Sequence, residues 1–380
     1  MTQRVGPAPG RVVEVGRLFL LLGVIGFGGP AAHIALMRDE VVRRRQWLDD
    51  TEFLEMVGAT NLIPGPNSTE LAIHLGHRRA GWRGLLVGGV CFIAPAVVIV
   101  SVIAWLYERY GTTPEFADLR YGVLPVIVAI IAHAVFALGR TALVTPSRMV
   151  LGAAALVAYL LGVHELLILL VAGVSAALWS LRSRVSDALR SLVLAPFVAA
   201  TDPNGTPVTL WRLFLVFLEI GSVLYGSGYV LVAFLQRMLV DDLGWLTSQQ
   251  VLDAVAVGQV TPGPVFTTAT FVGWQIAGPA GAAVATVGIF APSFVFVALL
   301  GRLVPWMRVR PTAKAFLDGV TVASLGLMAG VLVELADTAL TDVLTVAVAL
   351  AALAVLVRGR LNSAWLVGAG VLIGVLHAVL

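Results

Sequence analysis

Long apolar runs, separated by short clusters of charged residues, follow one another along nearly the whole chain. A run of about 20 apolar residues can cross a bilayer as a helix. We predict such helices near 17–36, 84–107, 121–140, 147–163 and 165–181, and near 210–233, 282–301, 315–336, 339–357 and 362–380. The pattern therefore predicts an all-α polytopic membrane protein with about ten transmembrane helices, five in each half. The stretch 147–181 also fits one long span.

The tripeptide Pro-Gly-Pro occurs twice, at 64–66 and at 262–264, and flanking residues repeat at the same spacing of 198 positions. Trp47-Leu48 falls on Trp245-Leu246 at this spacing. Shared hydrophobicity does not explain a repeat of tryptophan, proline and glycine. The chain is therefore interpreted as a duplication, with a first repeat over 1–181, a cytoplasmic linker over 182–209 and a second repeat over 210–380.

Each Pro-Gly-Pro interrupts an apolar segment, 51–76 in the first half and 249–275 in the second. Proline lacks a backbone N–H and clashes with the preceding helical turn, so two prolines around a glycine end a helix. A broken backbone at membrane depth is tolerated only where protein or a water-filled cavity supplies hydrogen-bond partners. We therefore expect each segment to be a re-entrant hairpin that faces an internal cavity.

Basic residues flank the first hairpin on both sides, at Arg38, Arg43, Arg44, Arg45, Arg78, Arg79 and Arg83. Because cytoplasmic loops carry the excess of lysine and arginine, both flanks are predicted to lie inside, as a re-entrant hairpin requires. In the second half the basic residues occupy the opposite loops, at Arg302, Arg308, Arg310, Lys314, Arg358 and Arg360. The two repeats are therefore expected to have inverted topology. One misfit is that this scheme places Arg4, Arg11 and Arg17 outside.

Inverted repeats with broken helices are typical of secondary transporters, whose substrate site lies near the membrane midplane. A helix that begins after Pro-Gly-Pro offers free N–H groups and the positive end of its dipole, which bind an anion without an arginine. In the first copy, Asn67 with Glu70 three residues later has the pattern of a helix N-cap. The second copy begins with the hydroxyls of Thr267 and Thr268. We predict a compact oxyanion held between the two helix ends.

The candidate substrate-binding residues lie in the two breaks, at the amides before them and in the glycine runs that border them. They are Asn61, Pro64, Gly65, Pro66, Asn67, Ser68, Thr69, Gln259, Thr261, Gly263, Thr267, Thr268, Gly28, Gly29, His33, Gly226 and Ser227. A single Pro-Gly-Pro is equally well explained as a structural kink. The glycine runs lack the preceding strand and the Lys-Ser/Thr of a phosphate loop, and close helix packing also explains them. Two copies in register favour a binding site.

Glu219 lies inside an otherwise apolar helix, where an ionised carboxylate costs about 2.5 kcal/mol or more. Glu219 is therefore a candidate for proton coupling, and a carboxyl hydrogen-bonded for packing explains it equally well. Glu70 and His74 are further candidates, because an ionised Glu70 would repel a dianion and a histidine beside the cavity can carry a proton. Taken singly, His33 and His74 are also explained as interior histidines with satisfied hydrogen bonds.

The composition, 59% hydrophobic and 12% charged residues, excludes an ordinary soluble protein. Cys91 is the single cysteine, and the scattered histidines lack metal-ligand spacing, so the sequence predicts no enzyme, no cofactor and no metal site. The expected surroundings are the lipid bilayer, with no nucleic acid. A homodimer stays open, because glycine-rich helix faces pack equally well within or between subunits.

Taken together, these motifs resemble the two-domain form of the chromate transporter (CHR) family. The resemblance rests on Gly26-Phe-Gly-Gly-Pro30 with His33, Trp47-Leu48, Asn61-Leu-Ile-Pro-Gly-Pro66, Gly81 and Gly84, and on Gly258-Gln-Val-Thr-Pro-Gly-Pro264 with Phe290-Ala-Pro292. It covers nearly the whole chain, although Tyr225-Gly226-Ser227-Gly228 stands where the family usually has Phe-Gly-Gly-Gly. The resemblance implies a multi-pass carrier of the inner (plasma) membrane that exports chromate, driven by the proton motive force, and gives chromate resistance. Sulfate is the related anion.

The residues by themselves specify only a compact oxyanion. Chromate and sulfate have the same charge and tetrahedral shape, so a transporter of sulfate or another oxyanion, working by uptake or exchange, stays open. An anion channel is a further alternative, and it predicts a flux that does not respond to the proton gradient.

Overall fold

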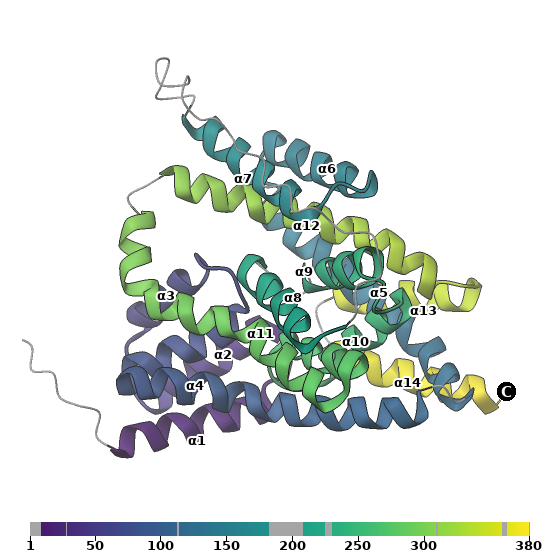
Figure 1. The fold of residues 1–380 in the computed structure, drawn as a ribbon, viewed down its shortest axis with the longest axis horizontal. Helices are drawn as coiled ribbons and strands as arrows, with labels where there is room; N and C mark the ends of the chain where they lie inside the picture. Colours follow the sequence, from purple (N-terminus) through teal and green to yellow (C-terminus); the bar gives the residue numbers. More distant parts are fainter. Residues whose placement is uncertain are drawn as a thin grey trace, which may run out of the picture.

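A computed structural model describes residues 9–27, 29–111, 114–181, 208–224, 230–308, 311–358 and 363–379. All elements of these residues are helices (Figure 1). The first half contains α1 (Pro9–Ile25), α2 (Gly29–Arg38), the π-helix η1 (Asp39–Arg44), α3 (Asp50–Thr60), α4 (Asn67–Tyr110), α5 (Pro114–Ala142), α6 (Pro146–Leu160) and α7 (Glu165–Leu181). The second contains α8 (Leu210–Val223), α9 (Val230–Phe234), the π-helix η2 (Leu235–Asp242), α10 (Ser248–Val260), the 3₁₀ helix η3 (Val265–Thr267), α11 (Thr268–Arg308), α12 (Pro311–Ala339), α13 (Val343–Val357) and α14 (Ser363–Val379). The protein is an all-α polytopic membrane protein, as predicted.

The helices of the two halves recur in the same order and at nearly constant spacing. The bounds of α5 and α6 are repeated 197 positions later by α12 and α13, and α4 corresponds in the same way to η3 with α11 at a spacing of 198. The stretch 147–181 is two helices, α6 and α7, separated by a turn at Gly162. The duplication inferred from Pro-Gly-Pro therefore extends to the helices themselves.

Helices α4 and α11 are not straight, because each folds back on itself near its beginning. The fold is centred on Gly81 in α4 (φ 61°, ψ −150°) and on Gly278 in α11 (φ 59°, ψ −151°). In α4 the carbonyl of Gly76 lies against Gly84, so close that a side chain on Gly84 would collide with it. The residues on either side of the fold therefore pack as an antiparallel pair.

The Pro-Gly-Pro segment of the first half enters and leaves at the same end of the molecule. Arg78, just before the fold of α4, donates a hydrogen bond of 3.1 Å to Glu52 at the start of α3. Arg79 and Arg45 both form ion pairs with Glu14 of α1, at 2.8 Å and 3.8 Å. These contacts join the two flanks of the break, which a hairpin does and a single crossing does not. The segment is therefore the expected hairpin.

Two predicted spans, 17–36 and 210–233, are wrong as continuous helices. The first is interrupted at Gly26 and Phe27, after α1, and the second at the extended residue Leu224, after α8. Glu14 of α1 contacts Arg45, which directly follows η1. After α2 the chain has therefore returned to the end of the molecule where α1 begins. A break of a few residues inside an apolar run leaves its hydropathy unchanged, so the run alone predicted one long helix.

This return also explains the misfit among the arginines. Arg11 and Arg17 lie on α1, beside the Glu14 that pairs with Arg45 and Arg79, and Arg4 lies outside the described residues. The start of α1 therefore belongs with the other basic residues of the first half. At the far end of α4, Glu108 accepts a hydrogen bond of 2.9 Å from Trp274 of α11.

Helices α4 and α11 run in opposite directions where they pack together. Glu108 near the end of α4 meets Trp274 near the start of α11, whereas Gly89, earlier in α4, lies against Phe294, later in α11. Because α4 and α11 are corresponding helices, the two halves are inverted with respect to each other.

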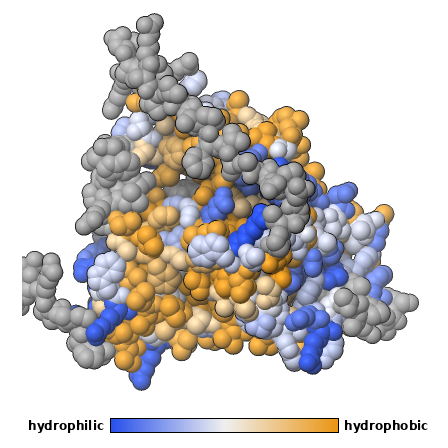
Figure 2. Space-filling model, in the orientation of Figure 1, coloured by the Kyte–Doolittle hydropathy of each residue, from blue (hydrophilic) through white to orange (hydrophobic). Residues whose placement is uncertain are grey.

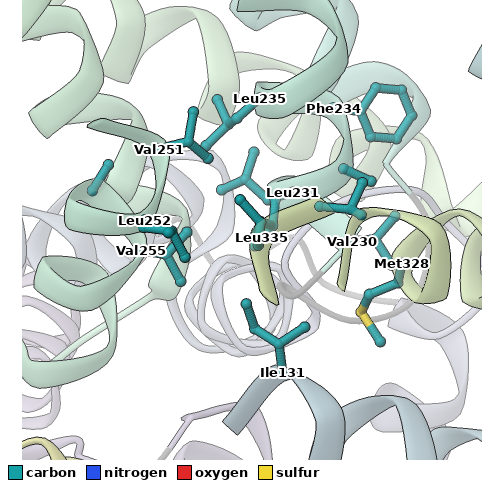
Figure 3. Close-up of a cluster of buried hydrophobic side chains, with 14 of the residues drawn as sticks. Ile131, Val230, Leu231, Phe234, Leu235, Val251, Leu252, Val255, Met328 and Leu335 are labelled. Carbon is teal, nitrogen blue, oxygen red and sulfur yellow. The ribbon is translucent and has the colours of Figure 1, made fainter. Parts of the chain in front are cut away.

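Several helices of the first half pack against helices of the second half instead of against their own. Helix α1 packs on α4, α8 packs on α11, and α4 and α11 pack on each other, whereas α5, α6 and α7 pack with α12, α13 and α14. Figure 1 shows α6 and α7 beside α12, well away from α1 and α4. Apolar side chains of α9, η2 and α10 join the first of these groups to α5 and α12 of the second (Figure 3). Those labelled in the figure are Ile131, Val230, Leu231, Phe234, Leu235, Val251, Leu252, Val255, Met328 and Leu335.

Four helical segments of the described residues are long and apolar enough to cross a membrane: Asn67–Tyr110, Arg120–Arg140, Val265–Leu300 and Pro311–Ala339. Shorter apolar helices are Pro146–Leu160, Glu165–Leu181, Val343–Val357 and Trp365–His377. Broad hydrophobic areas, interrupted by hydrophilic residues, cover the face shown in Figure 2. The expected linker, 182–209, lies almost wholly outside the described residues.

Candidate functional site

Each Pro-Gly-Pro break is held by the opposite half of the chain. The amide of Gly65 donates a hydrogen bond of 2.8 Å to the carbonyl of Leu224, which follows α8. The amide of Gly263 donates a bond of the same length to the carbonyl of Gly26, which follows α1. Leu224 lies 198 positions after Gly26, as Gly263 does after Gly65, so the two bonds are equivalent. Each repeat thus satisfies the broken backbone of the other.

Close packing and backbone conformation both require glycine at these two positions. Gly65 has φ 129° and Gly263 has φ 91°, conformations that residues with a side chain rarely adopt. A β-carbon on Gly65 would overlap the carboxyl of Glu70 and lie 2.8 Å from Oγ of Ser293. A β-carbon on Gly263 would lie 2.8 Å from that of Ala96. Each break therefore packs so closely against the long helix of the other repeat that no space is left for a side chain.

These contacts place the breaks halfway along the spanning helices. Ala96 is the middle residue of 82–110, the part of α4 after its fold, and Ser293 is central in 279–308 of α11. A helix of this length measures about 44 Å, close to the thickness of a bilayer with its headgroups. Both breaks therefore lie at the depth where transporters with inverted repeats bind their substrates.

The first break encloses polar side chains that have no hydrogen-bond partner. Thr69, Glu70 and Ser293 are each fully buried, with none of their residue surface exposed. The hydroxyls of Thr69 and Ser293 and both carboxyl oxygens of Glu70 make no hydrogen bond within the described part of the chain. Buried polar groups are normally paired, so these atoms are available to a ligand or a proton.

The second break offers a donor instead. The Nε2 group of Gln259, a residue with 8% of its surface exposed, is buried without a hydrogen-bond partner in the described structure. The hydroxyls of Thr267 and Thr268 donate to the carbonyls of Pro264 and Val265, at 2.9 Å and 2.7 Å. In this conformation the amide of Gln259 is the unused donor, and the two hydroxyls would have to rotate to bind an anion.

Asn67 does not cap its helix, contrary to the sequence interpretation. Pro66 occupies the N-cap position, because its carbonyl accepts the amides of Thr69 and Glu70, at 2.8 Å and 3.1 Å. The side chain of Asn67 instead donates to Oδ1 of Asn61 at 2.7 Å. The two amides therefore bridge the break from one side to the other, and the carboxyl of Glu70 is left without a capping bond.

The histidines and Glu219 occupy different places. His33 is 2% exposed, its Nε2 lies 2.9 Å from the carbonyl of Gly26, and its ring meets Phe92 edge-on. His74 is half-buried on α4, one turn beyond Glu70. Glu219 is half-buried on α8, and the titratable group near it is His164, in the turn between α6 and α7. The structure therefore brings Glu70 and His33 to the breaks and gives Glu219 a different neighbour.

Other candidate residues also lie at or beside the breaks. Pro64 lies in the break itself, Ser68 is buried in the first turn of α4, and Gly29 is the first residue of α2. Thr261 ends α10, where its hydroxyl donates to the carbonyl of Val257 at 3.0 Å. Gly28, Gly226 and Ser227 lie outside the described residues.

Ser293 and the carbonyls of Gly26 and Leu224 were missed by sequence reasoning. A signal for Ser293 is present, because Ala94-Pro95-Ala96 recurs 197 positions later as Ala291-Pro292-Ser293. The carbonyls have no such signal, since any residue carries one. Their role becomes visible only when the two halves are packed together.

One further cluster of charged groups lies away from the breaks. Ligand atoms of His164, Glu165 and Asp242 lie within 4.8 Å of one another, a spacing that could suit a metal ion. Arg237 lies 3.9 Å from Glu165 and 3.5 Å from Asp242, and its guanidinium donates to the carbonyl of Gly162 at 3.0 Å. A cation already neutralises these carboxylates, so the cluster is an ion-pair network between α7 and η2.

Comparison with known proteins assigns the chain to a family. The sequence model named Chromate transporter matches residues 13–177 and again residues 211–375. The chain belongs to the chromate transporter family. It is 33% identical over 351 residues to a probable chromate transport protein of Synechococcus elongatus, an alignment covering 90% of this chain and 88% of that one. It is 32% identical over 364 residues to a chromate transport protein of Cupriavidus metallidurans, covering 94% and 90%, and 30% identical over 346 residues to one of Pseudomonas aeruginosa, covering 87% and 82%.

No solved structure matches this chromate transporter family member. Each of its two matched segments contains one Pro-Gly-Pro break and the carbonyl that holds the other break. The candidate site therefore lies between two copies of the family unit, and neither copy completes it alone.

Proposed function

We propose that this protein is a secondary transporter that exports chromate across the inner (plasma) membrane, driven by the proton motive force, and so confers chromate resistance. The observation that carries the proposal is the reciprocal pair of hydrogen bonds, Gly65 to Leu224 and Gly263 to Gly26, which places two broken helices halfway along the spanning helices. The relatives named as chromate transport proteins support chromate as the oxyanion.

The chemistry of the breaks suits an oxyanion. Residues 61–70 and 259–268 contain no lysine or arginine, so binding depends on amide donors and on the positive ends of helix dipoles. The unused Nε2 group of Gln259 would donate to one oxygen of the anion, and the hydroxyls of Thr267 and Thr268 would rotate towards it. A site without a fixed cation releases its anion easily, as a carrier requires.

The membrane potential supplies a direct driving force for export. Moving one elementary charge across 100 mV changes the free energy by about 2.3 kcal/mol. An inside-negative potential therefore favours outward movement of a dianion by about 4.6 kcal/mol per 100 mV when no other ion moves with it. Alternating access of the two inverted repeats to the two sides would let the anion use this gradient without an open pore.

Cells without other chromate export provide the test. Cells that express the wild-type protein are expected to hold less chromate than cells with an empty vector and to grow at higher chromate concentrations. Gln259→Ala is expected to abolish both effects, whereas Gln249→Ala, a change of the same type at the start of α10, is the matched control and should preserve them. Chromate content that rises on expression would show uptake, and an unchanged content with altered sulfate flux would identify a sulfate transporter.

A further inference from the structure

The two breaks occupy equivalent places but differ in chemistry. Glu70 in the first repeat corresponds to Thr268 in the second at the spacing of 198, and Ser293 corresponds to Ala96 at the spacing of 197. The first break thus contains a carboxyl facing a hydroxyl, where the second contains a hydroxyl and a methyl group. The unpaired groups differ accordingly, with a carboxyl acceptor on Glu70 and an amide donor on Gln259.

No cation accompanies the carboxyl of Glu70. None of the described lysine, arginine and histidine side chains forms an ion pair or a hydrogen bond with it. His74 follows one turn later on the same helix and interacts electrostatically with His77 and Arg78. On the elements packed against the break, α11 contributes the neutral Ser293, and His33 of α2 is held at the other break by Gly26.

A proton is the ligand that suits this enclosure. An ionised carboxylate, fully buried without a partner, is strongly disfavoured, and a proton removes its charge. The resulting carboxylic acid has an O–H to donate and an oxygen that still accepts. Oε1 of Glu70 and Oγ of Ser293 both lie against Gly65, so the hydroxyl of Ser293 is the polar group placed to pair with this acid.

We propose that the two breaks bind different ligands: the first takes up a proton on Glu70, beside Ser293, and the second binds the oxyanion beside Gln259. This inference rests on the proposed transport function. An ionised Glu70 repels a dianion, whereas a protonated Glu70 admits it, so each ligand favours the binding of the other. The proton and the oxyanion therefore travel in the same direction.

The charge balance makes this direction compatible with export. A proton from the water on the side where the anion enters bonds to a carboxyl oxygen of Glu70 and leaves to the water on the other side. A dianion with one proton carries a net negative charge, so an inside-negative potential still expels it. The electrical part of the proton motive force drives export, and the pH part opposes it.

Flux into vesicles containing the purified protein separates the electrical part of the proton motive force from its pH part. At zero potential, an acidic exterior should drive chromate into wild-type vesicles, and chromate affinity should rise about tenfold for each unit by which the pH falls, as one linked proton requires. Glu70→Gln should remove the response to the pH gradient and keep the response to a potential set with potassium and valinomycin. Glu55→Gln, at an exposed acid on α3, is the matched control and should behave like the wild type.

The opposite results would overturn the inference. It fails if Glu70→Gln vesicles respond to the pH gradient like the wild type, or if His74→Gln or Glu219→Gln loses the response while Glu70→Gln keeps it. It also fails if chromate moves against the direction of the protons, because that is exchange and not co-transport.

Infrared spectroscopy tests the proton site without any flux. The difference spectrum of the purified protein between acidic and alkaline pH should contain the carbonyl band of a buried carboxylic acid. Glu70→Gln should remove this band, Ser293→Ala should shift it by removing a hydrogen bond, and Glu55→Gln should keep it. If the wild type moves no chromate but shows the band, the proposed function fails and the proton site stands. A band that persists in Glu70→Gln excludes the proton site, whatever the flux.

Discussion

The carbonyl oxygen of Gly26 accepts a hydrogen bond of 2.8 Å from the amide of Gly263. These residues belong to different repeats, and Gly65 and Leu224 form the equivalent bond in the other direction. Nε2 of His33 lies 2.9 Å from the same oxygen of Gly26. The two halves are therefore joined at the points where their helices are broken, so a movement of one repeat is transmitted to the break of the other.

A side chain at either central glycine should damage this junction. Gly65→Ala and Gly263→Ala force a positive φ on alanine and press its methyl group against Ser293 or Ala96. We expect each to destabilise the protein by about 1–3 kcal/mol, measured by thermal unfolding in detergent. Gly58→Ala, in the interior of α3 with open space around it, is the control and should be neutral or stabilising. Equal effects of all three would show that the junction is not tightly packed.

His33 should contribute through its bond to Gly26. His33→Phe keeps an aromatic ring against Phe92 and removes the hydrogen bond, so we expect a loss of about 1 kcal/mol in unfolding free energy. His377→Phe is the matched control, because His377 is exposed and stacks on Tyr121 at a ring separation of 4.1 Å. A loss for His377→Phe as large as that for His33→Phe would contradict a specific role for the buried bond.

The buried carboxylate of Asp253 should depend on Arg120. Asp253 is 6% exposed, lies 3.0 Å from Arg120 and accepts a hydrogen bond of 2.6 Å from Tyr107. Arg120→Met leaves this charge without its cation, at an expected cost of about 3–5 kcal/mol in unfolding free energy. Arg148→Met breaks a half-exposed pair with Asp318 and should cost less than about 1 kcal/mol. If the two variants unfold alike, the buried pair is not a significant source of stability.

The cap of α13 should make stability depend on acidic pH. Asp342, in the loop before α13, accepts the amide of Thr345 at 2.8 Å and the hydroxyl of Tyr121 at 2.6 Å, and these bonds hold the pKa of its carboxyl below the usual range. A carboxyl whose pKa is lowered on folding contributes stability above its unfolded pKa and loses that contribution as the pH falls through the folded value. The melting temperature of the wild type should therefore exceed that of Asp342→Asn at neutral pH, and the difference should vanish in acid. A difference independent of pH would contradict this.

The sequence predicted the spans with continuous apolar runs and clear ends, such as 121–140 within α5 and 165–181 as α7. It failed at 17–36 and 210–233, where a short break does not interrupt the apolar run. It also identified the two breaks, since proline and glycine act locally. The bonds that hold the breaks could not be predicted, because they join the two halves through carbonyl groups that every residue carries.

The most direct measurement is chromate flux in right-side-out and inside-out membrane vesicles that contain the protein, with an inside-negative or an inside-positive potential imposed. Wild-type protein should move chromate towards the positive side in both kinds of vesicle, sulfate should compete, and Gln259→Ala should abolish the flux while Gln249→Ala preserves it. Flux that is the same with and without the protein, or that survives unchanged in Gln259→Ala, would contradict an oxyanion carrier built on the two breaks.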